Sequence, residues 1–341
     1  MASSSSALLL CLLFISLATT TGHSYSSSNE AFLQCLHLHT KTSTKNLSKL
    51  LHTPNTTSYS SILLFSLVNT RFNTSSTPKP LLIFTPTHES HIQASVICSK
   101  SHGLSLRVRS GGHDYEGLSS RSQDHQPFII LDLTNVNSVT VDVDLATAWV
   151  QAGATLGDVY YQVANKSATL GFPAGVCPSV GVGGHISGGG MGTMVRKYGL
   201  AADNVLDVRL VDVHGRILDK DSMGEDLFWA IRGGGAASFG VVLSWKLRLV
   251  PVPSTVTVFT ITKKAEDGAI ELINKWQYIA DKLPEELYIE VVIQTVANGS
   301  GGGVEALFNC LFLGKSSQLL QGQVDPENFF RNEQSIPPLL I

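Results

Sequence analysis

The chain has 341 residues, of which 43% are hydrophobic and 15% charged, and its formal net charge at pH 7 is -3. This length is enough for one large or two ordinary domains with a sizeable core. Because neither a basic excess nor a basic stripe is present, the composition argues against a nucleic-acid or membrane-surface binder and favours a small neutral or mixed substrate.

Residues 1–24 predict a secretory signal peptide. An apolar run from Ala7 to Leu17 gives way to small polar residues suited to cleavage near Thr21 to Ser24. The run is too short to span a bilayer, and no later segment qualifies, so we expect a soluble, secreted protein. Five glycosylation sequons agree with export: Asn46, Asn55, Asn73, Asn165 and Asn298.

Four cysteines remain after removal of the signal, in an oxidising setting that allows three complete pairings. Cys35 and Cys98 both lie on apolar, helix-like runs, which makes a disulfide between them one candidate. Cys177 lies in a glycine-rich loop, a position that favours chemistry or a ligand over a structural thiol. Cys310, in a strand-like run, is expected to be an inert core residue.

The chain after residue 79 predicts a small βαβ layer. A strand in PLLIFTP is followed by a helix over 88–103, closed by Gly103, and then by strands in LSLRVRS and PFIILDLT. The glycine-flanked loop RSGGHDYEG, which carries His113, lies between the last two strands.

From Ser138 the pattern changes to short alternating runs, which predict a second lobe with an antiparallel sheet and helices. A proline-rich boundary, PVPS, follows at 251–254. The elements expected in this lobe are strands near 138–154, a helix at 155–167, a hairpin at 204–219, a helix at 225–232 and a strand at 239–250.

Beyond the boundary, the sequence predicts the opening of another α+β unit. Strands at 255–262, 287–297 and 304–314 accompany a helix over 266–283. We expect one face of that helix to carry Ile270, Ile273, Trp276 and Ile279. Three strands and one helix make a thin sheet with an exposed edge, so this unit looks incomplete. A short helix is expected to begin at Asp325–Pro326.

The densest glycine region is GVCPSVGVGGHISGGGMG, and a second cluster, RGGGAASFG, ends at Gly240. Side-chain-free positions let backbone N–H groups surround a bulky anion, so we favour a cofactor loop over a flexible surface loop. No G-x-G-x-x-G in a βαβ setting, Walker lysine, zinc motif or G-x-S-x-G elbow is present. A Rossmann dehydrogenase, a P-loop enzyme, a metal site and a serine hydrolase are therefore disfavoured.

His113 and Cys177 each lie in a loop that could face such a cofactor, and both side chains are good nucleophiles when deprotonated. A lone histidine is more often structural, but a neighbouring carboxylate, Asp114, could orient its ring. The residues alone support the two roles of His113 about equally.

The segments RSGGHDYEGLS, GVCPSVGVGGHISGGGMG and IRGGGAASFGVV together resemble the plant berberine bridge enzyme-like oxidases. These are secreted flavoproteins of the apoplast or cell wall with an FAD domain of the vanillyl-alcohol oxidase type. The resemblance implies an α+β fold, with a two-lobed FAD domain and a truncated α+β substrate domain built on an antiparallel sheet. The implied parts are a signal peptide (1–24), an N-terminal segment (25–75), the FAD domain (76–251), a partial substrate domain (252–320) and a C-terminal segment that rejoins the FAD domain (321–341).

The resemblance implies a bicovalent FAD, attached through His113 to the flavin 8α-methyl group and through Cys177 to flavin C6. It also pairs Cys35 with Cys98. Further residues expected to contact the cofactor are Arg109, Ser110, Gly111, Gly112, Asp114, Gly175, Val180, Gly181, Gly183, Gly184, His185, Gly188, Gly189, Gly190, Gly240 and Val241.

Three positions bear on the reaction. Val180 matches a site where family members that react with O2 carry a small side chain, which implies an oxidase that produces hydrogen peroxide. Tyr115 and Tyr198 match tyrosines near the flavin and the substrate, where the alternative role is aromatic packing around the ring.

The chain also departs from the family. The tract that supplies a catalytic base and a tyrosine motif has no counterpart, with a seam near Leu320 to Gln323, as a skipped exon, a gene-model error or a degenerating copy would produce. Base catalysis would then fall to Tyr115 or to water. The sequence therefore predicts an FAD-dependent oxidoreductase that uses O2 and an alcohol, carbohydrate or alkaloid-like substrate. The alternatives are a catalytically impaired secreted flavoglycoprotein and a carbohydrate-binding wall protein.

Overall fold

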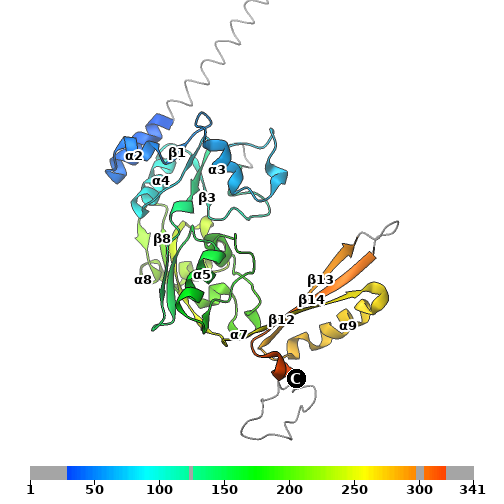
Figure 1. The fold of residues 1–341 in the computed structure, drawn as a ribbon. Coiled ribbons are helices and arrows are strands. Elements are labelled where there is room, and N and C mark those ends of the chain that lie inside the picture. The colour runs from blue at the N-terminus through cyan, green and yellow to red at the C-terminus, as the bar shows by residue number, and fades with distance from the viewer. Residues whose placement is uncertain (1–28, 123–125, 297–302, 320–341) are drawn as a thin grey trace, which may run out of the picture.

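The structure is a computed structural model that describes residues 29–122, 126–296 and 303–319. Helices and sheets are mixed, as the predicted α+β class requires. Among the described residues, the strands form sheets of four, five and three strands and one two-stranded pair. Figure 1 shows the two larger sheets in one body, from which the three-stranded sheet and its helix project.

The four-stranded sheet contains the predicted βαβ layer. Its strands are β1 (Leu51–His52), β2 (Leu82–Phe84), β3 (Ser105–Arg109) and β4 (Phe128–Asp132), in the order β1-β2-β4-β3. Both β2 and β3 run parallel to β4, which lies between them, and every residue of β2 and β4 is buried. Helix α4 (Glu89–Ser101) crosses from β2 to β3, and the chain turns after it at Gly103, whose φ is +63°.

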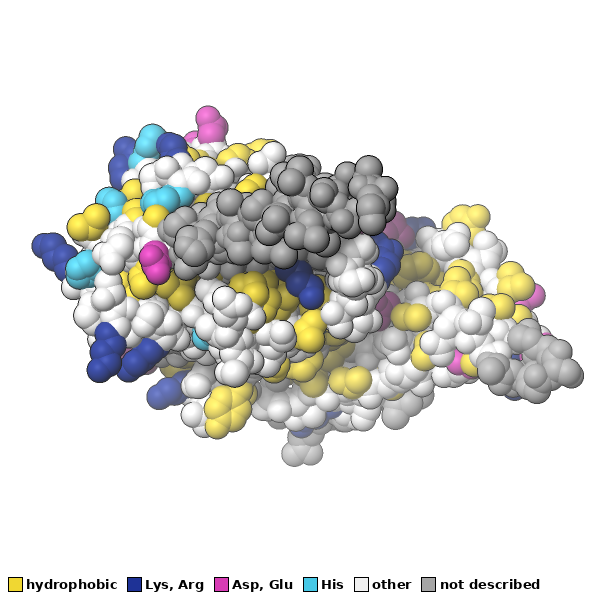
Figure 2. Space-filling model, turned by 90° about the horizontal axis from the view of Figure 1, so that it is seen from above, with side chains coloured by type: hydrophobic (Ala, Val, Ile, Leu, Met, Phe, Trp, Pro, Cys, Tyr) yellow, Lys and Arg dark blue, Asp and Glu magenta, His cyan; other side chains and the backbone are white. Residues whose placement is uncertain are grey.

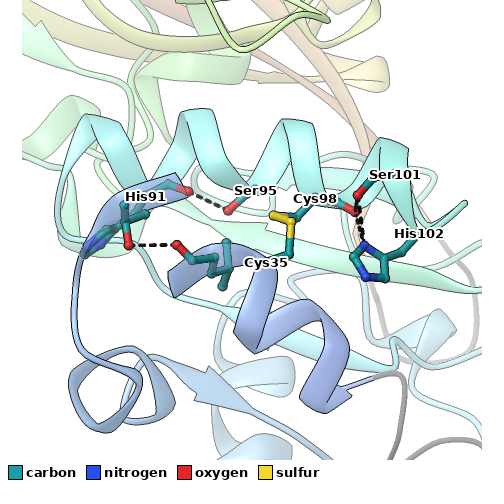
Figure 3. The surroundings of a disulfide bond; sticks show 8 residues. Cys35, His91, Ser95, Cys98, Ser101 and His102 are labelled. Carbon is teal, nitrogen blue, oxygen red and sulfur yellow. Dashed lines mark hydrogen bonds between the residues drawn. A yellow bond between two sulfur atoms is a disulfide. The ribbon is translucent and has the colours of Figure 1, made fainter. Parts of the chain in front are cut away.

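The N-terminal segment packs against this layer as a helix over residues 29–40, followed by α2 (Thr44–Ser48), α3 (Tyr59–Phe65) and η1 (Thr70–Phe72). Phe32 and Leu36 are fully buried. Between them in the chain, Cys35 forms a disulfide with Cys98 of α4, with the two Cα atoms 5.8 Å apart (Figure 3). The structure thus contains the disulfide that the resemblance implied.

The five-stranded sheet is antiparallel throughout and forms the predicted second lobe. Its central strand, β10, carries the fully buried Trp245 opposite Val150 and Val208. In sheet order the strands are β5 (Val139–Asp142), β6 (Thr147–Gln151), β10 (Val241–Arg248), β8 (Val205–Val211) and β9 (Ile217–Leu218).

The helices of this lobe are α5 (Leu156–Lys166), α6 (Val182–Ser187), α7 (Val195–Tyr198) and α8 (Lys220–Ala230), joined by the short turns η3 (Ala201–Asn204) and η4 (Ala236–Ser238). Helix α8 begins earlier than predicted, because Asp219 caps it through Ser222 and a kink at Gly224 joins two helical pieces. A two-stranded pair, β7 (Leu170–Gly171) with β11 (Val250–Pro251), completes the lobe.

The projecting sheet has the order β12-β14-β13, made of β12 (Thr257–Lys264), β13 (Leu287–Val296) and β14 (Gly303–Phe312). Helix α9 (Ala269–Ile279) packs against it, between the turns η5 (Ala265–Asp267) and η6 (Ala280–Lys282). Hydrophobic side chains of the projecting sheet and its helix are exposed on the face seen in Figure 2. Val258 of β12 is 72% exposed.

The predicted face of α9 is partly wrong. Ala269 is buried, and Ile273 and Trp276 pack with it against the sheet, whereas Ile270 is 67% exposed. At 3.6 residues per turn, positions separated by four and then three residues stay on one stripe, but repeated steps of three drift off it. Cys310 is buried on the same side, as predicted, and burial raises the pKa of its thiol to about 11.

Several predicted features lie outside the described residues: the signal peptide, the Asp325–Pro326 helix start, the seam near Leu320 to Gln323, and Asn298. The other four sequon asparagines are exposed: Asn46, Asn55, Asn73 and Asn165. Within the described ranges, no helix combines the length and apolar character needed to cross a membrane.

Candidate cofactor site

A cavity of about 550 Å³ lies where the loop after β3 meets the glycine-rich segment before and within α6. Its size suits a small-molecule cofactor or ligand. Eleven of the predicted cofactor residues line it: Ser110, Gly111, Gly112, His113, Asp114, Val180, Gly181, Gly183, Gly184, His185 and Gly240. Further lining comes from β3 itself and from residues 236–238, which belong to the second glycine cluster.

The two loops touch backbone to backbone. A Cβ atom at Gly111 would lie 2.3 Å from the Gly181 nitrogen, and one at Gly181 would lie 2.1 Å from the Ser110 Oγ. Any side chain at either position would force the loops apart. The glycines therefore build the cavity wall by close approach, as well as leaving backbone groups free to face a ligand.

His113 lines the cavity, and its Nε2 lies 3.0 Å from the Oγ of Ser179, two residues after Cys177. This contact joins the histidine loop to the cysteine loop. The expectation that Asp114 orients the imidazole is wrong: its carboxylate accepts hydrogen bonds from the backbone nitrogen and the hydroxyl of Ser119. The partner of the ring is a hydroxyl from the other loop.

Cys177 has an exposed, free thiol. It does not itself line the cavity, but Val180 and Gly181 do, so the thiol is carried within a few residues of the wall. The loop contains an element that the sequence did not reveal, helix α6, which begins at Val182 among the glycines. Glycine has a low helix propensity, so its abundance there hid the helix.

His185 of α6 lines the cavity and also braces the cysteine loop. Its Nε2 accepts a hydrogen bond of 3.0 Å from the backbone nitrogen of Gly175. Burial lowers the pKa of His185, which favours the neutral ring that this acceptor role requires. Gly175 itself does not line the cavity, and neither do Gly188, Gly189 and Gly190, the last two of which turn the chain at positive φ.

Arg109 was expected at the cofactor, but the structure places it away from the cavity. Its fully buried guanidinium pairs with Asp132 at 2.6 Å and donates to the carbonyls of Ile62 and Leu63. It thereby ties α3 to the four-stranded sheet. Arg107, two residues earlier, does line the cavity, and its buried Nε has no hydrogen-bond partner among the described residues.

Arg107 therefore lines the site, although the sequence did not indicate this role. It lies in the segment LSLRVRS, for which the sequence predicted only a strand. On strand β10, the predicted cofactor contact is wrong by one residue: Val242, rather than Val241, lines the cavity. Alternation along a strand turns adjacent residues to opposite faces, so an error of one residue reverses the assignment.

The two tyrosines with predicted catalytic roles do not reach the cavity. Tyr115 is 88% exposed, and the hydroxyl of Tyr198 donates to the carbonyl of Pro251. Neither residue lines the cavity. The nearby Arg196 and Lys197 instead connect α7 to the projecting lobe, through the carbonyls of Ala280 and Leu283 and through Glu286.

The residues present fit a large anionic cofactor such as FAD. Tight glycine loops open backbone groups to a pyrophosphate, Arg107 offers an unpartnered cationic donor, and the apolar wall suits a flat ring. Two nucleophilic side chains, His113 and Cys177, belong to loops that a hydrogen bond joins directly. No group of the described residues other than the disulfide pair with His39 offers three clustered metal ligands.

Comparison with known proteins places this site in context. Residues 80–220 match the FAD binding domain family, and residues 318–337 match the family described as berberine and berberine like. Berberine bridge enzyme-like 18 of Arabidopsis thaliana is 54% identical over 295 residues, which cover 86% of this chain and 54% of that protein. Tetrahydroberberine oxidase of Berberis wilsoniae is 50% identical over 329 residues, covering 96% and 59%.

Solved structures agree. Berberine bridge enzyme from Eschscholzia californica superposes with a TM-score of 0.78 at 40% identity, covering 87% of this chain and 58% of that one. Phl p 4, a grass pollen allergen with glucose dehydrogenase activity, gives a TM-score of 0.77 at 45% identity, covering 88% and 59%. The chain thus spans little more than half the length of its relatives, with a fold of the vanillyl-alcohol oxidase type. It belongs to the berberine bridge enzyme-like family of FAD-binding proteins.

Proposed function

We propose that this protein is a secreted, FAD-linked oxidoreductase whose cofactor is attached covalently through both His113 and Cys177. The observation that carries the proposal is the hydrogen bond of 3.0 Å between His113 and Ser179, which joins the histidine and cysteine loops at one cavity. Two nucleophiles held by loops in contact can act on one bound ring.

When bound, FAD supplies the redox chemistry, because it accepts a hydride from the substrate and passes the electrons to O2. His113 and Cys177 would each hold the cofactor through one covalent bond, formed at the expense of one hydrogen of the side chain and one of the flavin, which O2 would take up as hydrogen peroxide. The hydroxyl of Ser179 can accept or donate a hydrogen bond at Nε2 of His113 and would orient the ring toward the flavin. The glycine loops and Arg107 would hold the anionic part of the cofactor.

O2 as the electron acceptor is the second part of the proposal. Val180 is half-buried and lines the cavity, where a small side chain leaves room for O2 beside the ring. Among the relatives, Phl p 4 is described as a glucose dehydrogenase and its isoleucine-to-valine variant as a glucose oxidase. In Phl p 4, the loss of one methylene group from a side chain thus accompanies the change from dehydrogenase to oxidase.

Substrates named for the relatives include alkaloids and glucose, so we propose an alcohol, carbohydrate or alkaloid-like molecule as the substrate. A catalytically impaired flavoglycoprotein is the second candidate. It is favoured by the placement of Tyr115 and Tyr198 outside the cavity and by the chain's short span relative to its relatives. The exposed sequons support passage through the secretory route in either case.

Acid precipitation of protein from a secretory host tests the attachment. We expect the wild type, His113→Ala and Cys177→Ala to keep flavin in the pellet, because each single variant retains one bond. The double variant should release it, while His214→Ala, at an exposed histidine, serves as the control. Flavin released from acid-treated wild type contradicts the proposal, and peroxide formation on alcohols and oligosaccharides separates the active enzyme from the impaired flavoprotein.

A further inference from the structure

Cys177 lies on a short exposed segment whose two ends are firmly held. Residues 176–179 are exposed, and Val176 retains 70% of its surface. Exposed loops are ordinarily mobile, yet a thiol that must bond to one ring atom needs a defined position. The flanking residues Gly175 and Val180 show how the segment is fixed.

Three hydrogen bonds anchor the segment to a single helix, α5. On one side of Cys177, the hydroxyl of Tyr160 donates to the carbonyl of Gly175 at 2.5 Å. On the other side, the backbone nitrogens of Gly157 and Leu156 donate to the carbonyls of Pro178 and Val180, both at 2.9 Å. The segment therefore bridges one turn of α5, with Cys177 between the anchors.

Helix α5 is a rigid support for this bridge. Its start is closed by a reciprocal capping box between Thr155 and Asp158. Three apolar side chains of the helix are buried in the core of the lobe: Leu156, Val159 and Val163. Burial raises the pKa of Tyr160, so its hydroxyl stays protonated and able to donate.

The anchors differ in kind. The two on the far side come from backbone nitrogens at the helix start, which any sequence would present. The anchor at Gly175 comes from a side chain, Tyr160, and is the only one of the three that a substitution can delete without altering the helix. Gly175 is also held by His185 through its nitrogen, so the two groups fix opposite ends of one residue.

We propose that Tyr160 is a positioning residue for Cys177: by holding the carbonyl of Gly175, its hydroxyl sets the thiol where it can bond to the flavin. The inference rests on the proposed bicovalent attachment and deepens it. Misplacement of a reacting group by about 1 Å can cost about 100-fold in rate. The histidine attachment lies on another loop and does not depend on this anchor.

The test compares Tyr160→Phe with Tyr161→Phe in flavin-loaded protein. Tyr161 is the matched control, because it is the next residue of the same helix and is 68% exposed. Protein is denatured, treated with iodoacetamide and digested, and alkylated Cys177 is counted by mass spectrometry. We expect little alkylation in the wild type and Tyr161→Phe, and a rise of about tenfold in Tyr160→Phe, with flavin still bound through His113.

Two further measurements exclude a general loss of structure. Thermal unfolding should show Tyr160→Phe folded, and its peptide covering residues 172–181 should exchange amide hydrogens about five- to tenfold faster, the loss expected from one hydrogen bond. A Tyr160→Phe protein with Cys177 fully protected from alkylation would overturn the role of Tyr160 alone. Full alkylation of Cys177 in acid-stable, flavin-bearing wild type would instead refute the cysteine attachment, and this inference with it.

Discussion

The ion pair between Arg109 and Asp132 is the most completely buried charge contact among the described residues. Their side chains are 0% and 3% exposed, and the guanidinium also satisfies the carbonyls of Ile62 and Leu63. A charge removed from water this thoroughly is tolerable only while its partner remains. Arg109 thus links the N-terminal segment to the sheet that carries the histidine loop.

Replacing Arg109 should therefore destabilise the fold. We expect Arg109→Met to lower the free energy of unfolding by about 3–5 kcal/mol, because it leaves the buried carboxylate of Asp132 without its counter-charge. Urea denaturation measures this loss. Arg71→Met is the matched control, since its pair with Glu116 is 66% and 61% exposed and should contribute no more than about 1 kcal/mol. If Arg109→Met lost its flavin but kept the wild-type free energy of unfolding, Arg109 would instead be a cofactor-binding residue.

The sequence could not distinguish Arg109 from Arg107, although both lie in one short run. Each precedes the glycine loop, and the choice between a core ion pair and a cavity wall depends on Asp132, from a strand 23 residues away, and on α3. Long-range partners of this kind leave no local pattern. For His113, the residues alone left a structural and a functional role equally open, and only the family resemblance favoured the functional one.

Glycine serves two different purposes in the loops that form the cavity. Gly111 is needed because the neighbouring loop occupies the space of a side chain, whereas a Cβ at Gly184 would meet no atom within 4 Å. Both residues line the cavity. The first glycine serves loop packing, and the second leaves the cavity open.

Alanine at these two positions should have different effects, one on stability and the other on flavin binding. We expect Gly111→Ala to lower the free energy of unfolding by about 1–3 kcal/mol or more, because its Cβ would lie 2.3 Å from the Gly181 nitrogen. Gly184→Ala should fold like the wild type but bind less flavin, since the added methyl enters the cavity. Thermal unfolding and flavin absorbance per protein measure the two effects. Equal stability of the two variants would contradict this division.

Elements with strong periodicity were predictable, and those shaped by glycine were not. The strands of the βαβ layer and the helix over 155–167 follow from alternating or helical apolar patterns. Helix α6 was hidden by its glycines, and the buried stripe of α9 was misread because steps of three and four residues must alternate. The site was predictable as two loops, but their contact, His113 with Ser179, was not.

The disulfide joins the N-terminal helix to α4, two segments that are far apart in the chain (Figure 3). Cys35 and Cys98 are 63 residues apart, so the bond closes a long loop. Replacing both with serine should lower the free energy of unfolding by about 4 kcal/mol in the chain-entropy estimate. Urea denaturation tests this, with His214→Gln, at an exposed histidine outside the site, as the control. A loss no larger than that of the control would show that the packed helix holds without the bond.

The contacts of the N-terminal segment also predict how stability depends on pH. His91 is buried at 2% exposure, with one ring nitrogen near the hydroxyl of Thr42 and the other accepting from the backbone of Thr87. Burial, and secondarily the neighbouring His88, lowers its pKa from 6.5. The unfolded chain then binds the proton more readily than the folded one. This stabilising contribution is complete above pH 6.5 and is lost as the pH falls through the folded-state pKa.

We therefore expect the free energy of unfolding to decrease between pH 7.5 and about 5, and His91→Gln to flatten that decrease. Glutamine keeps a donor near Thr42 but cannot take up a proton in this range.

The groups that face His91 are His88, Thr42, Thr87 and the ring of Phe84, while the nearby Glu89 is paired with Arg209. Among the residues that face His91, His88 is the ionisable one, and a positive charge there would deepen the effect. His214→Gln, at an exposed histidine, should keep the wild-type slope. If the free energy of unfolding of His91→Gln varied with pH as steeply as that of the wild type, other groups would cause the pH dependence. His52 would be the next residue to replace, because burial also lowers its pKa.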